Sequence, residues 1–267
     1  GVPRVGQLPG QLHFESYPVS FGTRLRCAGQ TPLTVELTDT QEANLMTNQG
    51  YSVVRGADRA VTANKVLKNT YLLLSATLAF SALMAVVSVV AAVPSWMYLV
   101  SVVVAMIMGI FVLPRTANSA SGIGVIFAIT GLLGFGLGSI LSVYLTLPKG
   151  PEIIATAFGG TGLIFLGLSG YALTSKRNFS FLGGFVFAGM MVVVIAMLAN
   201  IFLAMPALSL AISGAIILLM SAFILFDTSR IINGGETNYI MATYGLYLSM
   251  FNIFVSLLQI LGIMGDE

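Results

Sequence analysis

One acid in this sequence could act inside a membrane, and an arginine follows it by three residues. Asp227 ends the apolar run 216–226, and Arg230 lies on the same face if this stretch is helical. Removal from water favours the neutral acid, whereas the arginine favours the carboxylate. The pair is therefore either a group that changes state with pH or an ordinary solvated ion pair. Glu236, in the segment Asn-Gly-Gly-Glu-Thr-Asn, is expected in a turn.

A stripe of small and polar residues runs along the last apolar stretch at alternating steps of three and four. Its members are Ala242, Gly245, Ser249, Asn252, Ser256 and Gln259. Polar side chains are costly in lipid, so we expect the stripe to face protein or water and this helix to be central. Two interpretations stay open: interhelical hydrogen bonds of about 0.6 kcal/mol each, or a lining for protons or ions.

The candidate residues divide by these roles. Asp227, Arg230, Ser249 and Asn252 are candidates for a response to pH or ions. Gly245, Ser256 and Gln259 are candidates for a helix-packing stripe.

Most catalytic chemistry is excluded by what the apolar part lacks. No histidine or cysteine follows Cys27, so the usual zinc, copper and haem ligands and a Ser-His pair are missing. Two membrane carboxylates for an aspartyl protease, and a lysine in the last apolar stretch for retinal, are also missing. We predict no catalytic residue, no metal site and no cofactor. The net charge of +2 gives no support for nucleic-acid binding.

The elements that position these residues are membrane helices. With 57% hydrophobic and 8% charged residues, the chain has too little polar surface for a soluble domain. We predict an all-α membrane protein, a seven-transmembrane-helix bundle with a central last helix. The expected spans are 70–93, 96–113, 122–147, 153–174, 181–205, 208–227 and 239–262.

Small residues predict how one of these helices packs. In the third span Gly124, Ala128, Gly131, Gly138 and Ser142 share one face, which we expect to be a helix–helix interface. Glycines are also frequent in the fourth and fifth spans. Close packing and sliding during gating are both compatible with that pattern.

Basic residues predict the orientation. They precede the first span and occupy alternate connections: Arg55, Arg59, Lys65, Lys68, Arg115, Lys176, Arg177 and Arg230. The opposite side has only Lys149. The positive-inside rule therefore places the N-terminus in the cytoplasm and the C-terminus outside.

The expected domains are an N-terminal cytoplasmic segment, 1–64, and a transmembrane domain, 65–267. The first 45 residues, with four prolines and no long apolar run, are expected to be mostly disordered. Either Met46 is the natural start and the preceding stretch is a non-native extension, or that stretch is a genuine tail offered to a partner.

The last two helices carry a family resemblance. The segments are Ile-Leu-Phe-Asp-Thr-Ser-Arg-Ile-Ile-Asn-Gly-Gly-Glu-Thr-Asn-Tyr-Ile at 224–240, Leu-Tyr-Leu-Ser-Met-Phe-Asn-Ile-Phe-Val-Ser-Leu-Leu-Gln-Ile-Leu-Gly at 246–262, and Ser-Phe-Leu-Gly-Gly at 180–184. They resemble the Bax inhibitor family of seven-helix membrane proteins over about residues 65–262, and most closely its bacterial branch that modulates the FtsH protease.

That resemblance implies two alternative functions. The first is an inner-membrane protein with FtsH and its regulators HflK and HflC as partners in the lipid bilayer, a slowly degraded substrate that restrains proteolysis. The second is a pH-sensitive calcium or proton leak, for which the family uses two aspartates and an arginine latch. The first aspartate matches Asp227, but the second position holds Ser249, which cannot ionise.

Overall fold

The computed structural model describes residues 39–175 and 177–265, with side chains from Val61 onward, and this part of the chain is helical without strands. The elements are α1 (Asp39–Val90), α2 (Met97–Ile107), η1 (Met108–Val112), α3 (Leu113–Thr116), α4 (Ser121–Tyr144), α5 (Gly150–Ser175), α6 (Leu182–Leu203), α7 (Pro206–Ile232) and α8 (Tyr239–Gly265).

Seven helical segments of the described chain are long and apolar enough to cross a membrane, which confirms the predicted architecture. They are Val61–Val90, Met97–Thr116, Ser121–Tyr144, Gly150–Ser175, Leu182–Leu203, Pro206–Ile232 and Tyr239–Gly265. Helices satisfy every backbone N–H and C=O within the segment, which lipid cannot do.

The first helix is longer than expected. Helix α1 begins at Asp39, whereas the first span was expected to begin at residue 70. The predictions of disorder and of a non-native extension fall largely on residues 1–38, which lie outside the described residues. The domain boundary at 64/65 stays a prediction.

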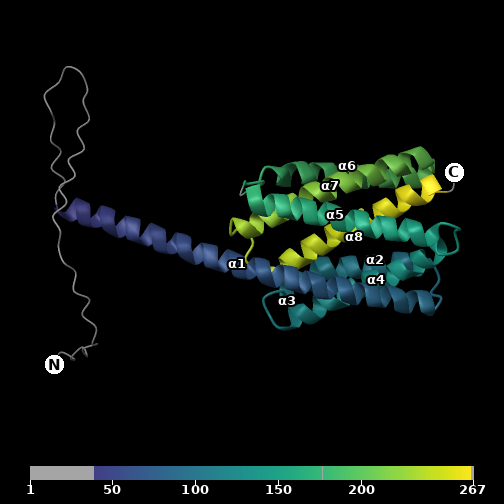
Figure 1. The fold of residues 1–267 in the computed structure, drawn as a ribbon, viewed down its shortest axis with the longest axis horizontal. Coiled ribbons are helices and arrows are strands. Elements are labelled where there is room, and N and C mark those ends of the chain that lie inside the picture. The colour runs from purple at the N-terminus through teal and green to yellow at the C-terminus, as the bar shows by residue number, and fades with distance from the viewer. Residues whose placement is uncertain (1–38, 176, 266–267) are drawn as a thin grey trace, which may run out of the picture. The chain divides into compact units, whose positions relative to one another are not determined.

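The last helix lies at the centre of the bundle, as predicted. Helix α8 packs against α4, α5 and α7, and it reaches α1 through Thr243 Oγ1, which donates to Thr70 O at 3.2 Å. Figure 1 shows α8 between the α5–α6–α7 group and the α2–α4 pair. Of the seven membrane segments, the one in α8 has the largest buried share.

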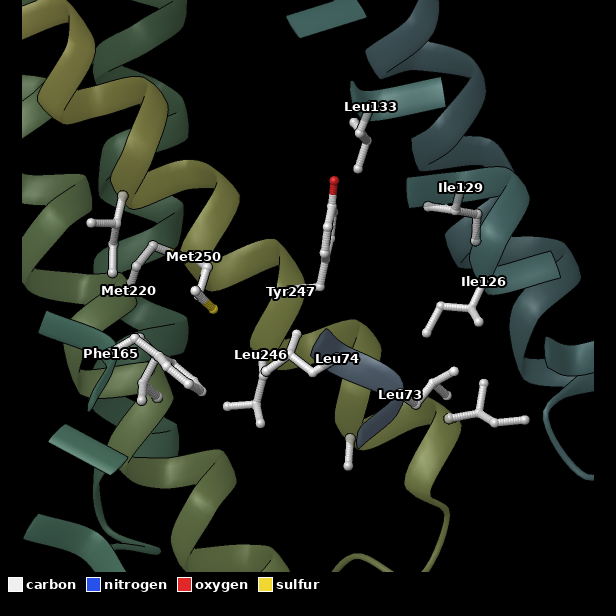
Figure 2. Packing of buried hydrophobic residues seen from close by; sticks show 14 of the residues in the cluster. Leu73, Leu74, Ile126, Ile129, Leu133, Phe165, Met220, Leu246, Tyr247 and Met250 are labelled. Carbon is white, nitrogen blue, oxygen red and sulfur yellow. The ribbon is translucent and has the colours of Figure 1, made fainter. Parts of the chain in front are cut away.

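Figure 2 shows how α8 fills the space between these groups. Tyr247 extends from α8 toward Leu133 and Ile129 of α4, while Met250 lies on the side of Phe165 and Met220. The Tyr247 hydroxyl is buried. It shares a 2.6 Å hydrogen bond with Ser81 Oγ of α1 and donates to Thr130 O of α4 at 3.3 Å. One side chain therefore joins three helices.

The interface predicted for the third span, α4, is partly wrong. Gly131, Gly134 and Gly138 lie against α1, at Phe80, Ser81 and Ala85 respectively. Gly124 and Ala128, which were expected on the same face, are exposed. The real contact face is rotated toward Gly134, because α4 carries several small-residue stripes and composition alone does not show which one meets a neighbour.

The second span is interrupted by the π-helical turn η1. An added Cβ at Gly109 in this turn would collide with the Tyr244 hydroxyl of α8. A larger residue here would therefore require the Tyr244 side chain to move, whereas the backbone conformation itself does not call for glycine.

Candidate functional site

The predicted pair at the end of α7 forms. Asp227 is buried, and its Oδ1 lies 3.8 Å from Arg230 Nη1. The other carboxylate oxygen lies against Gly245 of α8, so closely that a Cβ at Gly245 would collide with it. Gly245 thus belongs to the same site as Asp227, because its missing side chain leaves the space that the carboxylate occupies.

Arg230 is shared between two acids. Its Nη2 donates to Glu236 Oε2 at 3.1 Å, which is shorter than its approach to Asp227, and its guanidinium lies 5.4 Å from the ring centre of Phe226. The side chain is 38% exposed, against 10% for Asp227. Arg230 therefore bridges an acid buried in the bundle and an acid nearer its surface.

Glu236 lies in the turn after α7, as expected, but its pairing with Arg230 was missed. Gly234 has φ +70°, a left-handed conformation that favours glycine, and Gly235 N donates to Arg230 O at 2.8 Å. This turn brings the chain back over the arginine. The Asn-Gly-Gly sequence was the available indication of a tight reversal.

The two residues between Asp227 and Arg230 tie α7 to other elements. Thr228 Oγ1 lies 3.4 Å from Ser169 Oγ of α5, which accepts a hydrogen bond of 2.7 Å from Tyr71 of α1. Ser229 Oγ accepts from Phe179 N at 3.0 Å, in the connection between α5 and α6. These buried hydroxyls hold the end of α7 in place, a role that the sequence analysis did not assign.

The stripe on α8 faces protein, as expected. Ser249 and Ser256 are buried, and Gly245, Asn252 and Gln259 are partly buried. Two of the polar members bond within their own helix: Ser249 Oγ donates to Gly245 O at 3.0 Å, and Asn252 Nδ2 donates to Leu248 O at 2.8 Å.

Gln259 makes the interhelical bonds of the stripe. Its Nε2 donates to Ser209 Oγ at 2.6 Å, and its Oε1 accepts from Ser213 Oγ at 2.8 Å, both on α7. Gly245 and Gln259 are about 21 Å apart along the helix, at 1.5 Å per residue. The candidate residues therefore form two separate sites on the α7–α8 interface: an acidic site around Asp227 and Gly245, and a neutral site around Gln259.

The acidic site offers one buried carboxylate, that of Asp227, for a proton or a cation. No group of three His, Cys, Asp or Glu side chains comes together in the part of the chain that the structure describes. The roles assigned to Asp227, Arg230, Ser249 and Asn252 in a response to pH or ions stay predictions.

Comparison with known proteins identifies relatives over most of the chain. The sequence profile of the family described as "Inhibitor of apoptosis-promoting Bax1" matches residues 63–266. An Escherichia coli K12 protein named "Modulator of FtsH protease YccA" is 54% identical over 202 residues, 76% of this chain and 91% of the relative. The same figures hold for "Inner membrane protein YccA" of E. coli O6:H1. A Vibrio cholerae "Uncharacterized membrane protein" is 49% identical over 210 residues, 79% of this chain and 94% of the relative.

The profile match at 63–266 reaches all seven apolar helices and both sites on the α7–α8 interface. This chain, a multi-pass helical membrane protein, therefore belongs to the Bax inhibitor family.

Proposed function

We infer that this protein is an integral inner-membrane protein that binds and restrains the FtsH protease, in the manner of a slowly degraded competing substrate. The observation that carries the proposal is the 54% identity, over 91% of its length, to the E. coli protein named as a modulator of that protease. The protein has no catalytic activity of its own in this proposal. HflK and HflC are proposed as further partners beside the bilayer.

The N-terminus is proposed to lie in the cytoplasm and the C-terminus in the periplasm. Arg115, Arg177 and Arg230 follow the second, fourth and sixth membrane segments or end them, whereas Lys149 lies in a connection at the opposite end. At the proposed cytoplasmic end, a hydrogen bond joins two of the connections between helices, because Asn238 Nδ2 donates to Ala117 O at 2.9 Å.

Slow degradation has a physical explanation in how α1 is held. A protease that pulls on the N-terminal segment must first separate α1 from its neighbours. Tyr247 and Thr243 of α8 hydrogen bond to α1, and the α4 glycines allow the two backbones to approach closely. Extraction then requires local unfolding, so its rate is set by the stability of this packing, and an occupied protease stalls.

Deletion of the N-terminal segment tests the proposal. Removing residues up to about Val61, where the first membrane segment begins, should abolish protection of other FtsH substrates while the bundle stays folded. Co-purification of full-length and truncated protein with FtsH from membranes is the accompanying binding measurement. Unchanged protection by the truncated protein would refute the role of the segment.

A pH-sensitive calcium or proton leak is the second candidate function. The observation in its favour is the buried Asp227 carboxylate beside an arginine that is shared with Glu236. Calcium is the proposed ion in this alternative. The purified protein in liposomes should pass calcium at a pH-dependent rate, and Asp227→Asn, which cannot ionise, should flatten that dependence. Flux equal to that of empty liposomes would remove this function.

A further inference from the structure

A cavity of about 240 Å³ lies where α6, α7 and α8 meet, at the neutral end of the α7–α8 interface. Its polar lining consists of Asn200, Ser209 and Gln259. The four other lining residues are apolar, so the walls carry no charged side chain.

The polar groups of this cavity are arranged to donate. Gln259 donates one Nε2 hydrogen to Ser209 Oγ and accepts from Ser213 Oγ, which leaves its second Nε2 hydrogen as a further donor. Ser209 Oγ accepts from Gln259, which leaves the hydroxyl proton of Ser209 to donate. Asn200 Oδ1 accepts from Met205 N at 3.2 Å in the α6–α7 connection, which directs its Nδ2 donors elsewhere. A neutral wall that offers donors is complementary to a neutral acceptor such as a carbonyl oxygen.

Polarity changes with depth in the cavity. Asn200 lies three residues before the end of α6, and Ser209 lies three residues after the start of α7, about 4.5 Å from the helix ends. Met197, Ile212 and Ile216 lie deeper, about 9 to 15 Å from the same ends. The ends of helices of this length lie in the interfacial layer of a bilayer, and the deeper turns lie in hydrocarbon.

A phospholipid has the same order of polarity with depth, since its ester groups lie near the interface and its acyl chains lie deeper in the bilayer. We propose that the cavity is a lateral binding site for the acyl ester of a bilayer phospholipid. Ser209 and Asn200 donate to the ester carbonyl, and the first methylene groups lie against Met197, Ile212 and Ile216. Met197 and Ile201 are exposed on α6, so a lipid can enter from the side.

Photo-crosslinking tests this site with a matched pair of variants. Full-length protein in nanodiscs receives phosphatidylethanolamine that carries a diazirine on an acyl carbon near the ester. Adducts should concentrate on 197–201 and 209–216. Ser209→Ala should lower that yield at least severalfold, whereas Ser213→Ala should leave it within about twofold. Each variant removes one hydrogen bond to Gln259, but only Ser209 lines the cavity.

Two controls make the outcome decisive. Thermal unfolding of both variants shows that they are folded, and an ether-linked analogue of the same lipid lacks the carbonyl and should label the cavity weakly. Equal labelling by the ether lipid would overturn the proposal. So would adducts spread evenly over lipid-facing residues of α6 such as Phe187 and Val194, or an equal loss in the two serine variants.

Discussion

At the scale of single residues, Gly245 of α8 and the Asp227 carboxylate of α7 are in close contact. The carboxylate occupies the space that a side chain at position 245 would need. Gly245→Ala should therefore destabilise the folded protein by about 1 to 3 kcal/mol, the usual cost of overpacking, despite the better helix propensity of alanine. Thermal unfolding of the purified protein in mild detergent measures the change.

A second glycine provides the control for this prediction. Gly162 of α5 has no atom within 4 Å of an added Cβ, so Gly162→Ala should be neutral or stabilising. Combining Gly245→Ala with Asp227→Ala should restore part of the lost stability, because the two positions share one space. Equal unfolding temperatures for the two single glycine variants would contradict the contact.

The contribution of the Tyr247 hydroxyl to stability can be tested by removing its single oxygen atom. Tyr247→Phe removes the hydrogen bonds to Ser81 and Thr130 while the ring keeps its packing, so we expect a loss of about 0.6 to 1.5 kcal/mol. Tyr171→Phe makes the same chemical change on a half-exposed ring and should have little effect. The difference between their unfolding temperatures is the measurement, and a larger loss in Tyr171→Phe would refute the role of Tyr247.

At the scale of elements, Asn238 joins the start of α8 to the segment that follows α3. Its Oδ1 accepts from Ile240 N at 2.9 Å, as an N-cap, and its Nδ2 donates to Ala117 O. Asn238→Ala should cost about 1 to 2 kcal/mol, because both functions are lost. Asn238→Asp keeps the capping acceptor without the donor, so unfolding measurements should place it between the wild type and Asn238→Ala. An aspartate variant as unstable as the alanine variant would show that the cap contributes nothing.

The elements themselves were largely predictable, since length and hydropathy fix which segments cross a membrane. The polar stripe also gave the central place of the last helix, because Ser249 and Asn252 must avoid lipid. The partners of α4 were not predictable. Gly124 and Gly134 are the same residue type on one helix, and only the fold shows that the second meets Ser81 while the first meets nothing within 4 Å.

Only the local part of the acidic site was predictable from the sequence. Asp227 and Arg230 are three residues apart on one helix, so their pairing follows from local geometry. Glu236, Gly245 and Ser169 join them through a turn or from other helices, and such contacts depend on tertiary packing. The cavity between α6, α7 and α8 likewise has no local signature, because its walls come from three separate segments.

At the scale of the whole molecule, the proposed restraint of FtsH depends on how firmly α1 is held in the bundle. Gly134→Leu places a side chain against the Ser81 backbone, which cannot move aside as a flexible side chain can. Overpacking of about 1 to 3 kcal/mol corresponds to a factor of about 5 to 150 in the population of the opened state. The half-life of this variant in cells with active FtsH should fall accordingly, as measured by following the protein after synthesis is stopped.

Gly124→Leu is the matched control, because it adds the same side chain to the same helix at an exposed position with open space around it. Its half-life should equal that of the wild type, and both variants should be stable in cells that lack FtsH. Protection of other FtsH substrates should fall with the half-life of the variant, since a substrate that is extracted quickly no longer occupies the protease. If Gly134→Leu were degraded quickly and still protected other substrates fully, restraint would depend on binding alone, and the explanation by slow extraction would fail.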